Sequence, residues 1–188
     1  MFNRNEDGFT GLEAAIVLIA FIVVAAVFAY VVLGAGFYTT QKAQETVYRG
    51  IEQSTTNVQL VGNVYGLASD TDEGIDQVRF TIGLVPGTPY IDLEKMKIVV
   101  STPTSSPKIL VWTNASSSTD DTNFIALKDG IGPSQTTMTS GDQTEIQFNI
   151  TAVDRDTKIN FEIRPGLGAS FPFSKTTPSL ISPNNLLY

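Results

Sequence analysis

The sequence contains neither cysteine nor histidine among its 188 residues. Without cysteine there is no disulfide, thiolate zinc site, iron–sulfur cluster or thiol nucleophile. Without histidine the commonest general base and the imidazole metal ligand are also missing. We therefore expect a protein that is not an enzyme and that holds no metal or other cofactor. The net charge of −7 argues against a nucleic-acid partner, because phosphates attract basic proteins.

Charged residues are also missing from a long N-terminal stretch. No Asp, Glu, Lys or Arg occurs between residues 14 and 41, and the 24 residues from Ala14 to Phe37 are apolar. As a helix they would extend about 36 Å, which exceeds the ~30 Å hydrocarbon core of a bilayer. Gly34 and Gly36 would each cost about 1 kcal/mol in an exposed helix. They predict either a flexible point or close packing of a neighbouring helix.

The helical pattern continues beyond the apolar run and becomes amphipathic. Apolar residues recur at helical spacing, and charged residues occupy other positions. This pattern predicts one continuous helix from about Thr10 to about Leu60. The alternative is an isolated membrane anchor with a short extension. The apolar positions are Val47, Ile51, Val58 and Val61, and the charged ones are Lys42, Glu45, Arg49 and Glu52.

The apolar period changes to two after residue 62. Apolar and polar residues alternate over residues 78–84, 145–150 and 159–163, which is typical of strands with one buried face. Shorter apolar runs cover residues 98–101, 109–113 and 124–127, and the proline-containing tail after Pro165 is expected to be extended. No helical pattern intervenes. We predict an α+β protein in which a long N-terminal hydrophobic α-helix precedes an antiparallel immunoglobulin-like β-sandwich over residues 63–188.

Two further patterns concern surface chemistry. Asn114-Ala115-Ser116 and Asn149-Ile150-Thr151 are N-glycosylation sequons, so Asn114 and Asn149 are candidates for an N-linked glycan. The acidic run from Asp70 to Asp76 superficially suggests a calcium loop, but it lacks the full twelve-residue EF-hand pattern. We therefore interpret the acidic run as a solvated linker.

The N-terminus resembles a known family. Gly8-Phe9-Thr10-Gly11-Leu12-Glu13, the apolar run and Thr39-Thr40-Gln41-Lys42 look like an archaeal flagellin (archaellin), a member of the type IV pilin-like superfamily. The strand at residues 159–163 followed by Arg164-Pro165-Gly166 resembles the end of the family's domain. The resemblance implies a structural subunit of the extracellular archaeal flagellum (archaellum), used for swimming motility. It would polymerise into a helical filament through its N-terminal helix, residues 9–62, alone or with paralogous subunits.

The resemblance also implies processing of a membrane-inserted precursor. A prepilin-type leader peptidase would cut between Gly8 and Phe9 and remove residues 1–8 as a class III signal peptide. The leader carries Arg4, Glu6 and Asp7, which would hold the uncut N-terminus in water, and burying such charges unpaired is costly. The alternative is a polar cap that is never cut.

Glu13 is the fifth residue counted from Phe9. In related pilins a glutamate at this offset neutralises the N-terminal amine of a neighbouring subunit, and residues four apart share one helix face. The alternative is a carboxylate that reaches solvent at the membrane interface. Glu13 is not a catalytic acid in either case.

Two other functions remain open at the level of sequence. An adhesion pilin of the same superfamily would have the same leader and helix. A membrane-anchored surface-binding module or hydrolase would have a similar sandwich domain, but the missing histidine and cysteine disfavour the hydrolase. The helical pattern after Phe37 disfavours a simple anchor.

Overall fold

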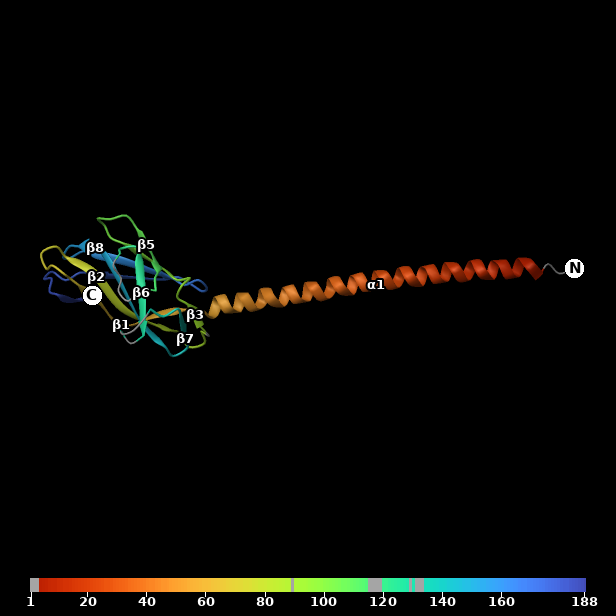
Figure 1. Ribbon diagram of the computed structural model, residues 1–188, viewed down its shortest axis with the longest axis horizontal. Helices are drawn as coiled ribbons and strands as arrows, with labels where there is room; N and C mark the ends of the chain where they lie inside the picture. Colours follow the sequence, from red (N-terminus) through yellow and green to blue (C-terminus); the bar gives the residue numbers. More distant parts are fainter. Residues whose placement is uncertain (1–3, 89, 115–119, 129, 131–133) are drawn as a thin grey trace. The chain divides into compact units, whose positions relative to one another are not determined.

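The computed structural model describes residues 4–88, 90–114, 120–128, 130 and 134–188, with side chains described from Gly11 onward. The chain divides into two compact units, residues 1–49 and residues 50–188. Helix α1 (Arg4–Thr55) is drawn in red to orange in Figure 1. It is uninterrupted because no proline occurs before Pro86 and because Ala, Leu and other good helix formers are frequent.

The predicted C-terminal end of the helix is wrong by about five residues. Helix α1 ends at Thr55, and β1 (Val58–Leu67) begins at Val58. The tripeptide Thr55-Thr56-Asn57 consists of poor helix formers. Val58 is buried and pairs with Leu84 of the next strand, so long-range pairing takes precedence over the helical spacing. Residues 58–62 therefore belong to the sheet domain.

The described part of residues 50–188 contains a nine-stranded sheet with the order β10-β9-β4-β5-β6-β8-β2-β1-β11, and a separate two-stranded sheet, β3-β7. The antiparallel β domain is confirmed, with one parallel pair, β5–β6, that was not expected. The remaining strands of the large sheet are β2 (Ile75–Leu84), β4 (Lys97–Ser101), β5 (Lys108–Trp112), β6 (Asn123–Lys128), β8 (Gln143–Val153), β9 (Lys158–Arg164), β10 (Phe171–Thr176) and β11 (Asn184–Leu187), and those of the small sheet are β3 (Tyr90–Asp92) and β7 (Thr137–Thr139).

The predicted strand positions are confirmed by these bounds. The three alternating segments lie in β2, β8 and β9, and the three shorter apolar runs lie in or overlap β4, β5 and β6. The tail is extended as expected, and it also forms the two edge strands β10 and β11.

The large sheet folds over itself and closes. Thr176 at the end of β10 and Tyr188 after β11 exchange both backbone hydrogen bonds, with N···O distances of 2.6 and 3.2 Å. Across the core, the ring centre of Phe80 on β2 lies 5.4 Å from that of Phe173 on β10 and 6.3 Å from that of Phe161 on β9. These strands are not neighbours in the sheet, so the rings pack between two layers, as in a sandwich.

Gly168 lies in the loop after β9, at a position where a side chain would collide with the backbone. Its φ of +106° is left-handed, and an added Cβ would lie 2.0 Å from the carbonyl oxygen of Thr56. That carbonyl belongs to the segment that joins α1 to β1. Gly87 has a similar φ of +100°, but an added Cβ would meet nothing within 4 Å.

We expect Gly168→Ala to lower the free energy of unfolding of the sheet domain by more than the roughly 1–2 kcal/mol that a left-handed backbone alone costs. Gly87→Ala is the matched control, because it carries the backbone cost without the collision. Urea unfolding of both variants measures the difference. Equal destabilisation would mean that the loop after β9 moves freely away from Thr56.

Candidate assembly surface on the N-terminal helix

Helix α1 exposes its apolar residues in every direction. The large apolar side chains from Leu12 to Tyr38 are between 52% and 79% exposed. In the described chain the helix from Gly11 to Thr55 is long and apolar enough to cross a membrane, judged by length and composition only. Exposed apolar surface on this scale marks a membrane-facing or protein-binding surface.

Gly34 and Gly36 lie in the middle of this exposed surface. An added Cβ at either position would meet nothing within 4 Å, so no contact within the described chain requires a glycine there. The hydroxyls of Thr39 and Thr40 donate to the carbonyl oxygens of Ala35 and Gly36 at 2.8 and 2.9 Å. The hydroxyls of both threonines are thus hydrogen-bonded within the helix. At the two glycines the helix surface has no side chain.

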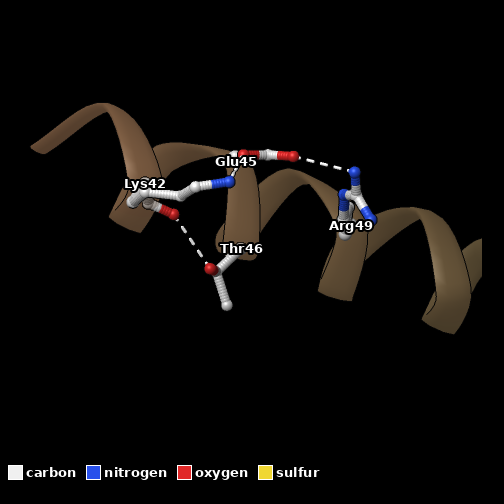
Figure 2. Close-up of polar contacts among 4 residues, drawn as sticks. All are labelled: Lys42, Glu45, Thr46 and Arg49. Carbon is white, nitrogen blue, oxygen red and sulfur yellow. Dashed lines mark hydrogen bonds and ion pairs between the residues drawn. The ribbon is translucent and has the colours of Figure 1, made fainter. Parts of the chain in front are cut away.

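A compact charge cluster follows the apolar run (Figure 2). The ammonium group of Lys42 and the guanidinium group of Arg49 donate to the two carboxylate oxygens of Glu45, at 2.7 and 2.8 Å. Thr46 donates to the carbonyl oxygen of Lys42 at 2.9 Å. The hydrogen bond from Lys42, followed by the charge of Arg49, holds the pKa of Glu45 below its ordinary value. The helix therefore partly neutralises its own charges where its polar part begins.

The lowered pKa of Glu45 predicts an acid-sensitive helix end. When folding lowers the pKa of a carboxylate, the ionised carboxylate stabilises the folded state at pH values above its ordinary pKa of about 4.3. This stabilisation is lost as the pH falls through the lowered pKa. We expect Glu45→Gln to remove this part of the acid sensitivity of helix content, measured by circular dichroism on a peptide spanning residues 37–55. Glu52→Gln is the control, because Glu52 makes no ion pair among the described residues. Equal acid sensitivity of wild type and Glu45→Gln would contradict the prediction.

The sequence-predicted N-terminal residues all fall within α1. The Gly8–Phe9 bond lies in its helical backbone, and the side chains of these two residues lie outside the described set. Glu13 is exposed, four residues after Phe9. Cleavage after Gly8 would make Phe9 the first residue of the helix, where the helix dipole favours a nearby carboxylate such as Glu13.

The two sequons lie in different environments. Asn114 is exposed after β5, but Ala115 and Ser116 of its sequon lie outside the described residues. Asn149 lies on the outer face of β8 and is half-buried; its side-chain oxygen accepts a hydrogen bond from Gln77 at 3.0 Å. The hydroxyl of Thr151 in the same sequon accepts one from Lys108 at 2.8 Å. Asn149 therefore takes part in the hydrogen bonds of the sheet surface, whereas Asn114 is exposed outside the strands.

The acidic run after β1 forms a turn. The carboxylate of Asp70 accepts the backbone N–H of Asp72 at 2.9 Å, and that of Asp76 accepts the N–H of Ser69 at 3.2 Å. In the part of the chain that the structure describes, no group of three or more acidic, histidine or cysteine side chains could hold a metal ion. The acidic run is therefore the turn between the paired strands β1 and β2 within the sheet domain, and not the linker that the sequence predicted.

The hydrogen bonds from threonine hydroxyls back into the helix were not predicted from the sequence. Besides Thr39 and Thr40, Thr46 and Thr55 donate to the carbonyl four residues earlier, Thr55 at 3.0 Å to Ile51. The signal in the sequence was their position inside a helical pattern, where a threonine hydroxyl commonly bonds to the i−4 carbonyl.

An uncovered apolar helix joined to a β domain with its own closed core defines a pilin-like chain. Among the described residues, the large apolar side chains of the helix from Leu12 to Tyr38 are exposed, and the sheet domain has a buried core of its own. The family-level comparison agrees: residues 8–175 match the archaeal-type flagellin model. The chain belongs to the archaeal-type flagellin family.

Individual relatives and structures agree with this assignment. The chain is 40% identical to "Probable flagellin 1" of Archaeoglobus fulgidus over 96% of this chain and 95% of that one. It is similar to the subunit in the structure of the archaeal flagellum of Methanospirillum hungatei, with a TM-score of 0.72, 32% identity, and coverage of 95% of this chain and 99% of that one. An archaeal flagellin from Methanocaldococcus jannaschii has the same fold, with a TM-score of 0.59 at 17% identity, covering 70% of this chain and 96% of that one.

Proposed function

We propose that this chain is a structural subunit of an archaeal flagellum filament, an extracellular appendage for swimming, and that it polymerises through α1. The observation that carries the proposal is the exposure of the apolar helix on all sides. Because the apolar residues from Leu12 to Tyr38 are more than half exposed, this part of the helix needs other chains or lipid around it. The relatives named as flagellins favour this role over an adhesion pilin.

The helix suits two environments in turn. Before assembly the apolar run would lie in the membrane, where its side chains face lipid tails. In a filament the helices would bundle, and the gain relative to lipid comes from close packing rather than from the hydrophobic effect. Gly34 and Gly36 lack side chains at positions that are open in the single chain, so they would let a neighbouring helix approach closely.

Assembly would follow removal of residues 1–8 by a prepilin-type leader peptidase at the Gly8–Phe9 bond. Cleavage removes Arg4, Glu6 and Asp7 and leaves one new amine at Phe9. Glu13 would neutralise that amine on a neighbouring subunit, so that neither charge is buried alone. Glu13 is exposed on its own helix and free to serve this role.

The sheet domain would form the outer shell and carry glycan. Asn114 is the better candidate of the two sequons, because it is exposed, whereas Asn149 is half-buried and hydrogen-bonded by Gln77. The glycan would attach to the amide nitrogen, so the half-buried position of this amide, rather than the hydrogen bond to its oxygen, disfavours Asn149. We expect no catalytic role, since the filament works mechanically and the family is one of structural subunits.

One measurement tests processing and surface modification together. We expect the protein recovered from sheared extracellular filaments to begin at Phe9, with extra mass on the peptide that contains Asn114 and less or none on the peptide that contains Asn149. Mass spectrometry of tryptic and N-terminal peptides gives both results. A start at Met1, or the absence of the chain from extracellular filaments, would overturn the filament role.

A further inference from the structure

The outer face of the strand pair β1–β11 is unusually apolar for a surface. Tyr65 and Leu186 lie directly opposite each other in the pair, and Tyr188 follows two residues later on the same face. Their side chains are 47%, 50% and 62% exposed, respectively. We call these three residues the β1–β11 face. Tyrosine is a common interface residue because its ring packs on apolar surface while its hydroxyl bonds to polar groups.

A second apolar surface lies on the outer face of β4 and β5. Val99 and Ile109 lie directly opposite each other, and Val111 follows on the same face. Ile109 and Val111 are 53% and 44% exposed. We call these three residues the β4–β5 face. Beside them a groove of about 380 Å³ is lined by Val99, Pro172 and Glu162, among others.

The two faces lie on opposite sides of the sheet domain. In the sheet order, β6, β8, β2 and β1 separate β5 from β11 in one direction. The contact between Thr176 and Tyr188 closes the sheet. In the other direction, β5 and β11 are therefore separated by β4, β9 and β10. One chain therefore cannot bring its two apolar faces together.

We propose that the β1–β11 face of one copy docks on the β4–β5 face, including its groove, of a neighbouring copy. This inference rests on the proposed filament function and names the contact between the outer domains. A helical polymer repeats one heterologous contact, which needs two different faces that point away from each other. The sheet domain has such a pair.

The chemistry of the two faces is complementary. The β1–β11 face offers two aromatic rings and two phenol hydroxyls. The groove offers apolar walls at Val99 and Pro172, and the carboxylate of Glu162 as an acceptor for a phenol. The hydrogen bond from Arg164 keeps the pKa of Glu162 below its ordinary value, so this acceptor is ionised at neutral pH.

The two faces are too small to hold two free domains together, so the contact suits copies that are already joined in a polymer. Three side chains on each face bury far less than the about 1,200 Å² at which stable interfaces begin. Such a contact forms when the N-terminal helices already hold the domains close together, because tethering raises the effective concentration. We therefore expect no dimer of the sheet domain in isolation.

Cysteine cross-linking tests the contact on a clean background, because the native sequence has no cysteine. Filaments of the double variant Leu186→Cys/Ile109→Cys are treated with a short bismaleimide and separated on a denaturing gel. We expect a ladder of dimers, trimers and longer oligomers. Each single variant is expected to give monomers only, because like faces do not meet. The matched control Leu186→Cys/Thr137→Cys places the second cysteine on β7, at another exposed position, and is expected to give no ladder.

Three results would overturn the proposed contact while leaving the filament function intact. In the first, the double variant forms normal filaments but gives no ladder. In the second, the control Leu186→Cys/Thr137→Cys gives an equal ladder. In the third, Leu186→Cys alone gives dimers. Where the double variant does not polymerise, copolymers of the two single variants replace it; dimers support the contact and their absence overturns it. Failure of the wild-type chain to form filaments would instead overturn the proposed function.

Discussion

Replacing Val24 with glutamate is expected to abolish filament formation while leaving the sheet domain folded. Val24 lies in the middle of the apolar run of α1, and its side chain is 66% exposed. A carboxylate at this position would be buried without a partner in every subunit of a helix bundle, at a cost of several kcal/mol each. Electron microscopy of sheared cells and a swimming assay measure the loss.

Val24→Leu is the matched control, because it keeps the surface apolar; it is expected to assemble as the wild type does. Thermal unfolding of the sheet domain should be the same in all three proteins, since residue 24 lies outside that unit. A charge at the centre of the apolar run also weakens membrane insertion, by about 2.5–3.5 kcal/mol. Cell fractionation is therefore needed to distinguish failed membrane insertion from failed assembly. Filaments of normal length from Val24→Glu would show that this part of the helix is not buried in the assembly.

Phe80→Ala is expected to destabilise the sheet domain by about 3–5 kcal/mol. The ring of Phe80 is 1% exposed and contacts three others, with ring-centre distances of 6.0 Å to Phe148, 6.3 Å to Phe161 and 5.4 Å to Phe173. Its removal leaves a cavity between the two layers of the sheet. Urea unfolding followed by near-ultraviolet circular dichroism measures the change in free energy.

Tyr90→Ala is the control for Phe80→Ala. Tyr90 is an aromatic residue on β3 that is 53% exposed, so its loss is expected to change stability by less than about 0.5 kcal/mol. A loss of less than about 1 kcal/mol for Phe80→Ala would mean that the core collapses around the missing ring, and that the two layers are less firmly packed than the ring contacts suggest.

These two substitutions separate the two parts of the molecule by what their apolar residues contact. Most apolar side chains of the sheet domain form its own core, and these core residues are almost fully buried. The helix leaves its apolar side chains exposed, so they are available to other molecules. A core substitution is therefore expected to change folding first, and a helix substitution to change assembly first.

The sequence alone was sufficient for features that depend on neighbouring residues. Helix α1 follows from a long run of apolar helix formers without proline, and the strands β2, β8 and β9 follow from their alternating pattern. The resemblance to archaeal flagellins rests on residues near Gly8 and Glu13, a local motif that folding does not change. The cleavage bond, the pairing of Glu13, the roles of Gly34 and Gly36 and the glycan sites stay predictions.

Only the tertiary structure decided the features that depend on distant residues. The helix ends at Thr55 because Val58 pairs with Leu84, although the local spacing allowed several more helical residues. The parallel pairing of β5 with β6, and the closure of the sheet by Thr176 and Tyr188, depend on which strands meet in space. The two apolar outer faces could be recognised only once the strand order was known, because exposure depends on what covers a residue.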